Sequence, residues 1–153
     1  MRAGRTPPSG APAPGSQAVS PETAFVLEAD DARFLTEVGM LAAGCGDVQH
    51  ADTIFNALRR VRPDRAYPLV GLAVARLNAG RAAEAARLLE AADLADPQER
   101  GVAHAWRGLA LQLAGFGAES RRVLADACAL PGEGGALARQ MLGLAPEVSN
   151  DDV

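Results

Sequence analysis

The sequence carries a repeat of about 34 residues, and this repeat limits the fold more than any other feature. Gly46 lies 34 residues before Gly80, and Gly115 follows 35 residues later. The same offsets relate three further sets of positions: Ala51, Ala85 and Ser120; Phe55, Leu89 and Leu124; and Pro63 and Pro97, with Pro131 one residue early. A repeat of this length is typical of an array of helix pairs, in which each pair buries its apolar face only against its neighbours.

Composition agrees with one small helical domain. The chain has 153 residues, enough for a single domain with a core of its own. Apolar residues make up 48% of the chain but aromatic residues only 4%, so small side chains must fill much of the core, and these allow helices to pack closely. The formal net charge of −4 argues against a general nucleic-acid-binding surface.

The cysteines and the apolar runs predict a cytoplasmic protein. Cys45 and Cys128 are too few and too far apart for a disulfide framework, which favours a reducing compartment. No apolar run approaches the roughly 20 residues that cross a bilayer, and the first 21 residues hold no apolar stretch of the kind found in secretory signals. We therefore expect no membrane insertion.

The chain divides into three segments. Residues 1–20, rich in proline and glycine, are predicted to be a disordered tail. Residues 21–145 are the predicted helical repeat domain, and residues 146–153 are an acidic flexible tail. Ser20 and Pro21 form a helix-start signal, and a short helix through Phe25–Leu27 is expected after them.

Apolar residues at helical spacing predict the helices of the domain. The first ends at Gly44 and carries Phe34, Leu35, Val38 and Leu41 at this spacing. The others are expected over 47–61, 65–79, 81–94, 97–114, 117–129 and 135–144. Asp96 is a predicted N-cap with Glu99 completing a capping box, and the last helix is expected to cover the open apolar end of the stack. The prediction is an all-α, right-handed array of three helix pairs with a C-terminal capping helix.

These positions resemble the tetratricopeptide repeat, which places small residues where paired helices touch. The small positions of the first helices are Gly39, Ala73 and Gly108. The matching positions of the second helices are Ala51 and Phe55, Ala85 and Leu89, and Ser120 and Leu124. The resemblance covers about residues 31–131, and it departs from the pattern in two ways. Most large aromatic residues of the first helices are missing, and the third repeat is one residue longer.

Within that superfamily the chain is similar to the small repeat chaperones of type III secretion systems. The similarity lies in Ala51–Leu89, where Ala57-Leu58-Arg59 leads to Arg62-Pro63-Asp64-Arg65-Ala66-Tyr67-Pro68 and to Gly71-Leu72-Ala73. This stretch resembles the chaperone that holds the needle subunit before export. The resemblance implies a protein partner, and it allows for a second small chaperone in the complex.

In a repeat of this kind, the first helix of each pair lines a concave groove. The resemblance places these partner-binding residues there: Met40, Tyr67, Val70, Val74, Leu77, Ala105 and Leu109. Repeat domains that grip a terminal carboxylate need polar donors at such positions, whereas Met40, Val74 and Leu109 stand where asparagine would be needed. An apolar groove suits the apolar face of an amphipathic helix. The N-terminal tail, the Phe25–Leu27 segment or a second copy could instead fill it, or these residues could be ordinary core.

Two functions follow from the groove. In the first, the protein is a chaperone that holds an amphipathic helix of a needle-type secretion subunit and prevents its premature self-assembly. In the second, it is a general scaffold or adaptor that joins protein partners. Genes of a secretion apparatus beside this one would favour the first.

The sequence predicts no catalytic residue, cofactor or metal. His50 and His104 have no second ligand at zinc spacing from a cysteine. Residues 132–135 lack the preceding strand and the lysine of a phosphate-binding loop. The arginines near the end of the second helix either stabilise the helix terminus or bind an acidic partner; they are Arg59, Arg60, Arg62 and Arg65.

Overall fold

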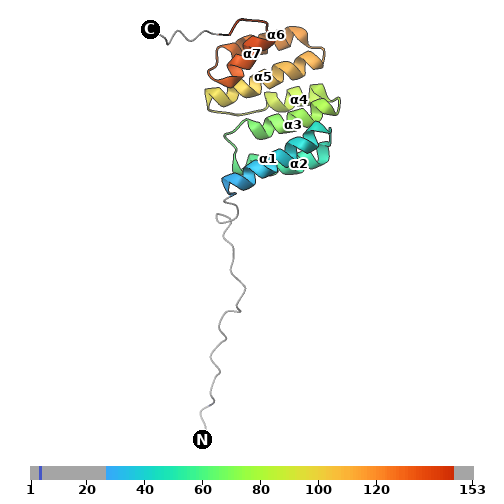
Figure 1. Ribbon diagram of the computed structural model, residues 1–153, viewed down its shortest axis with the longest axis vertical. Coiled ribbons are helices and arrows are strands. Elements are labelled where there is room, and N and C mark those ends of the chain that lie inside the picture. Colours follow the sequence, from blue (N-terminus) through green and yellow to red (C-terminus); the bar gives the residue numbers. More distant parts are fainter. Residues whose placement is uncertain (1–3, 5–26, 147–153) are drawn as a thin grey trace, which may run out of the picture.

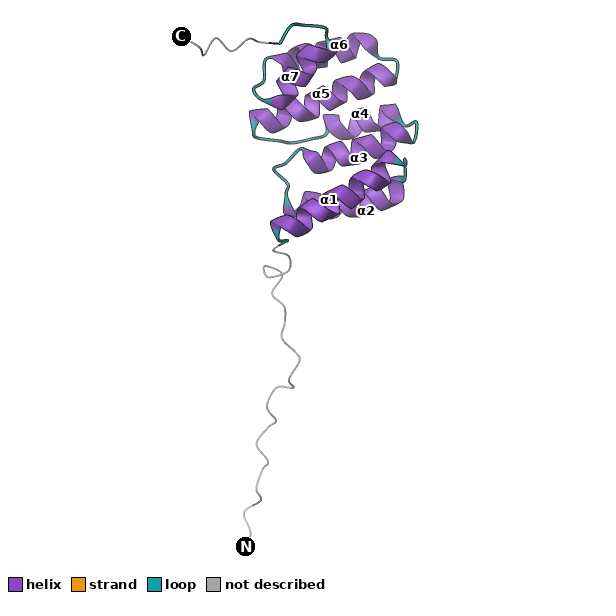
Figure 2. Ribbon diagram, in the orientation of Figure 1, coloured by secondary structure: helices purple, strands orange, loops and turns teal. Residues whose placement is uncertain are grey.

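The computed structural model describes residue 4 and residues 27–146, and this part of the chain contains helices and no strand (Figure 1, Figure 2). The helices are α1 Ala29–Gly44, α2 Val48–Val61, α3 Tyr67–Asn78, α4 Ala82–Glu90, α5 Pro97–Leu113, α6 Gly117–Cys128 and α7 Glu133–Met141. The all-α class is confirmed. Apart from Gly4 and Pro146, the predicted tails lie outside the described residues. The helix expected through Phe25–Leu27 does too, except for Leu27, which is not helical.

Within residues 27–146, consecutive helices pack on one another, and among alternate helices only the odd-numbered ones do. α1 packs on α2, α3 on α4, and α5 on α6, while α1 also contacts α3, α3 contacts α5, and α5 contacts α7. Figure 1 shows the helices stacked in chain order, with α1 and α2 at one end of the stack and α6 and α7 at the other. The stack therefore begins with α1 and α2 and ends with α6 and α7.

Glycines at equivalent positions form the turns inside successive helix pairs. Gly46, Gly80 and Gly115 have φ values of 70°, 75° and 88°. This left-handed conformation is readily available to glycine, which is why glycine commonly follows the end of a helix. The spacing of about 34 residues in the sequence is thus the spacing of these turns.

Small residues on one helix meet large residues on the next, as the repeat predicts. A Cβ atom on Gly39 would lie 2.9 Å from the ring of Phe55, and one on Gly71 would overlap the same ring. Phe55 is completely buried. Gly108 likewise leaves room for Leu124. These contacts let the helices approach closely around a few large side chains.

The apolar face of α1 differs from the expected one. The buried residues of α1 are Ala32, Gly39 and Ala43, whereas Phe34 and Leu41 are 65% and 73% exposed. The ring of Phe55 fills the space beside Gly39, so the contact with α2 requires small residues. Leu35 still packs against the core, whereas Phe34 and Leu41 lie on the opposite face of the helix.

α4 is shorter than predicted and ends at Glu90. The amide of Ala91 still bonds to the carbonyl four residues back, but the amide of Ala92 bonds to Leu89, three residues back. This tightening ends the helix. Leu94, predicted as helical, instead lies in the connecting segment and is only 4% exposed.

The predicted N-cap at Asp96 is confirmed, but the predicted capping box is not. The side chain of Asp96 accepts a hydrogen bond of 2.8 Å from the amide of Gln98, as an N-cap should. Glu99 does not complete a capping box: its carboxylate accepts a hydrogen bond of 2.6 Å from the amide of Ala66 and pairs with Arg65 at 3.2 Å. Glu99 therefore links the start of α5 to the start of α3, where the amide of Ala66 would otherwise lack a partner.

Candidate partner-binding surface

The central helix α3 carries a half-buried apolar stripe. Tyr67, Val70, Val74 and Leu77 are all partly exposed, and their spacing of three and four residues places them on one face. The other apolar residues of this helix are buried: Pro68, Leu69, Gly71, Leu72, Ala73 and Ala75. The partly exposed apolar residues of α3 are therefore the four that were predicted on this helix to bind a partner.

Two more predicted residues come from the helices that contact α3. Met40 on α1 is 40% exposed, and Leu109 on α5 is half-buried. We call Met40, Tyr67, Val70, Val74, Leu77 and Leu109 the inner row. Tyr67, Val74 and Leu77 also pack against the core. A substitution at Val70 should therefore affect folding less than a substitution at any of these three residues.

Ala105 is the exception among the predicted residues. It is completely buried and packs in a small core with Leu124, Ala127 and Ala138. α5 contacts both α6 and α7, and a methyl side chain at this position is covered by them. Ala105 offers no surface to a partner, so its assignment to the groove was wrong.

Leu113 extends the same face of α5 and was not predicted. It lies four residues after Leu109, on one side of the helix, and is 63% exposed. The prediction missed it because the groove residues predicted on this helix end at Leu109. The apolar residue four positions beyond Leu109 was the signal that could have found it.

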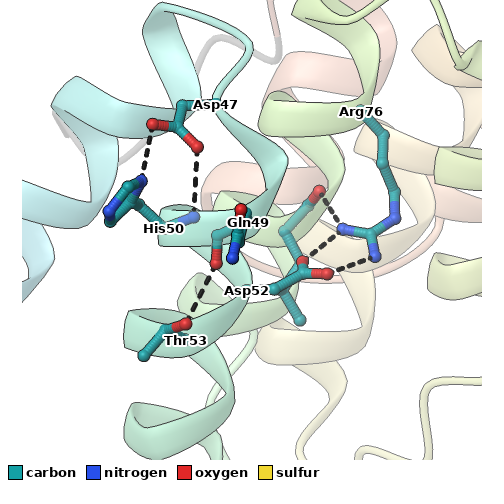
Figure 3. A network of polar contacts seen from close by, with 7 residues as sticks. Asp47, Gln49, His50, Asp52, Thr53 and Arg76 are labelled. Carbon is teal, nitrogen blue, oxygen red and sulfur yellow. Dashed lines mark hydrogen bonds and ion pairs between the residues drawn. The ribbon is translucent and has the colours of Figure 1, made fainter.

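Arg76, near the end of α3, lies on the other side of the helix from the inner row and forms an ion pair with α2. Figure 3 shows Arg76 facing Asp52 on α2, with hydrogen bonds of 2.7 and 3.0 Å between the guanidinium and the carboxylate. Arg76 also donates to the carbonyl of Leu72 at 3.0 Å. Such a two-pronged pair fixes both side chains and ties α3 to α2.

Two titratable groups among the described residues, Asp47 and His104, have a lowered pKa. The pKa of Asp47 is lowered, chiefly by the hydrogen bond from the backbone amide of His50, and this carboxylate caps α2 (Figure 3). Burial lowers the pKa of His104, and the charge of Arg107 adds to the effect. Residues 27–146 contain no group of three potential metal ligands. Cys45 is exposed and Cys128 half-buried.

A cavity of about 550 Å³ lies beside the arginines at the end of α2. Arg59 and Arg60 line it together with Leu69 and Leu94, and both arginines are exposed. Arg65 is engaged with Glu99. The cavity lies outside the inner row, so an acidic ligand there would not compete directly for that apolar surface.

None of the helices in the described part of the chain is both long and apolar enough to cross a lipid bilayer.

Comparisons with protein-family models, with curated proteins and with solved structures gave no match. Any functional assignment therefore rests on the chain itself.

Proposed function

We propose that this chain is a tetratricopeptide-type repeat protein that binds an amphipathic helix of a partner protein on its inner row. The observation that carries the proposal is the half-exposed apolar stripe on α3, in the middle of the stack. The glycine turns at equivalent positions and the contact of Gly39 with Phe55 support the repeat. An apolar surface that remains partly exposed on a folded domain is typical of an interface.

The chemistry of the inner row fits a helix better than a carboxylate-bearing terminus. Its residues are apolar or aromatic, so they offer no charged donor to a carboxylate. Met40 can adapt to an irregular apolar ligand because its side chain is unbranched and flexible. Apolar residues on a bound helix at positions i, i+3, i+4 and i+7 would match this surface.

The partner we propose is a self-assembling subunit of a type III secretion system, of the needle type. Covering the apolar face of such a subunit would keep it from assembling before export, in the cytoplasm. This part of the proposal rests on the resemblance of residues 51–89 to needle-subunit chaperones. It makes the protein a binding protein with no catalytic role and no cofactor.

The test uses Val70→Asp and Val74→Asp in the full chain, co-expressed with a needle-type subunit. An unpaired carboxylate in an apolar contact costs more than the about 1–3 kcal/mol of a neutral polar group, so we expect binding to be weaker by at least roughly 100-fold. Ala125→Asp on the exposed side of α6 is the matched control and should bind like the parent chain. Circular dichroism checks that each variant is folded.

Three outcomes separate the possibilities. Weakened binding by the two α3 variants alone supports the inner row as the binding surface. Unchanged binding by both, with the subunit still captured, means that the ligand lies elsewhere on the chain. Failure of the parent chain to bind any needle-type subunit, while it joins two other folded proteins, means that it is an adaptor instead.

A further inference from the structure

α1 carries a second exposed apolar surface, separate from the inner row. Phe34, Val38 and Leu41 are all exposed, and their spacing of four and three residues places them on one face of the helix. This face is opposite to the buried residues Ala32, Gly39 and Ala43. We call Phe34, Val38 and Leu41 the α1 stripe.

The repeat shows what this stripe corresponds to. A shift of 34 residues carries it onto Pro68, Leu72 and Ala75 of α3, all of which are buried. A further shift of 35 carries it onto Ala103, Arg107 and Ala110 of α5. Ala103 and Ala110 are buried, and Arg107 is half-buried between Glu90 and Glu119. The exposed positions of α1 are thus covered positions elsewhere in the array.

The neighbours of each helix explain the difference. α3 packs on α1, α2, α4 and α5, and α5 packs on α3, α4, α6 and α7. Among the described residues α1 packs only on α2 and α3. The stripe is therefore the face that a preceding element of the chain would cover, and it is apolar as such a covered face requires.

We propose that residues 20–26 fold back along α1 and cover the α1 stripe. This segment supplies Phe25 and Val26, and only Leu27 and Glu28 separate it from α1. The distance along α1 from Ala29 to Leu41 is about 18 Å, at 1.5 Å per helical residue. Seven extended residues reach about 23 Å, so the segment can span the whole stripe.

Charge favours this segment over a second copy of the chain. Two α1 helices packed antiparallel would bring Asp30 and Asp31 of one copy to the C-terminal end of the other. The helix dipole is negative there, so these carboxylates would be destabilised. Residues 20–26 contain a single charged side chain, Glu22, and avoid this conflict. The proposal does not depend on what binds the inner row.

The test is a double-mutant cycle on the full chain. One variant combines Phe25→Ser with Val26→Ser, and the other is Phe34→Ser, at the stripe residue nearest the start of α1. If the segment covers the stripe, the first variant lowers Tm by roughly 4 °C, and it lowers Tm much less when Phe34 is already serine. Pro7→Ser combined with Pro8→Ser is the matched control in the preceding part of the chain and should leave Tm unchanged.

Either of two results would overturn the proposal: no loss of Tm from the first variant, or an equal loss in both Phe34 backgrounds. Light scattering gives the mass of the parent chain, and a dimer that Phe34→Ser converts to a monomer would show that a second copy covers the stripe. Should Phe34→Ser lack the helical circular dichroism of the parent, Phe34→Gln replaces it in the cycle.

Discussion

The two ends of the helical stack present different surfaces. At the N-terminal end, α1 exposes Phe34, Val38 and Leu41. At the C-terminal end, the exposed residues of α7 are Glu133, Ala136 and Gln140, and the exposed Leu144 follows the helix. A terminal unit with a polar outer face is what a repeat array needs for solubility. α7 meets that need, and α1 alone does not.

The two ends also differ in how the terminal helix packs on its neighbours. On α7, Gly134 and Gly135 are buried, and a Cβ atom on Gly134 would overlap the backbone of Gly101 on α5. The contact is thus made between backbones. On α1, Gly39 meets the ring of Phe55 instead. Both terminal helices therefore pack closely on their neighbours. The two ends differ in the outer face of the terminal helix, which is largely polar on α7 and apolar on α1.

The largest expected effect is at the N-terminal end. Phe55→Ala removes a completely buried ring that packs beside both Gly39 and Gly71, and we expect a loss of about 3–5 kcal/mol in the free energy of unfolding. Urea denaturation measures it, and hydrogen exchange should show that α1 and α2 lose protection before α7. The matched control is Phe116→Ala, an exposed ring, which should change stability by less than about 0.5 kcal/mol. Equal losses in the two variants would contradict the packing described for α1.

A smaller effect is expected at the C-terminal end from Gly134→Ala. The new methyl group would meet backbone atoms of Gly101 and Val102, and backbone cannot rotate away as a side chain can. We expect a loss of about 1–3 kcal/mol, with α7 the first helix to lose hydrogen-exchange protection. Gly117→Ala is the control, because nothing lies within 3.7 Å of its Cβ position. If both variants are equally stable, α7 is not seated by backbone contact.

The smallest expected effect is a dependence of stability on pH, caused by His104 on α5. Burial is the main reason that its pKa lies below the usual 6.5 in the folded chain. The unfolded chain then takes up the proton at a higher pH, so stability is fully present above about pH 6.5 and falls as pH decreases through the folded pKa. Urea midpoints between about pH 5 and pH 8 should show this slope, and His104→Gln should flatten it. An unchanged slope in that variant would assign the dependence to other groups.

The turns and the closest helix contacts could be predicted from the sequence because they depend on residue size and backbone freedom. Gly46, Gly80 and Gly115 occur at the repeat spacing, and only a residue such as glycine adopts their conformation readily. Gly108 and Leu124 meet for a similar reason, since a small residue leaves room for a large one. Ser120, at the repeat position that alanine occupies in the first two repeats, donates its hydroxyl to the carbonyl of Gly108 at 2.7 Å.

The candidate site was predictable only in part. Tyr67, Val70, Val74 and Leu77 lie on one face because helical spacing places them there in any structure. Whether that face is covered depends on neighbouring helices, and Ala105 was misplaced because α6 and α7 close over it.

What the sequence by itself determined is the helical class, the turns and the positions where small residues meet large ones. These follow from local conformational preference and from side-chain volume. The tertiary structure alone decided which apolar face of each helix is buried. In α1 the pattern at Phe34, Val38 and Leu41 is as apolar as a core face, yet it is exposed, while the equivalent Leu72 is buried in α3. Burial requires a neighbour, and periodicity within one helix carries no information about which neighbours are present.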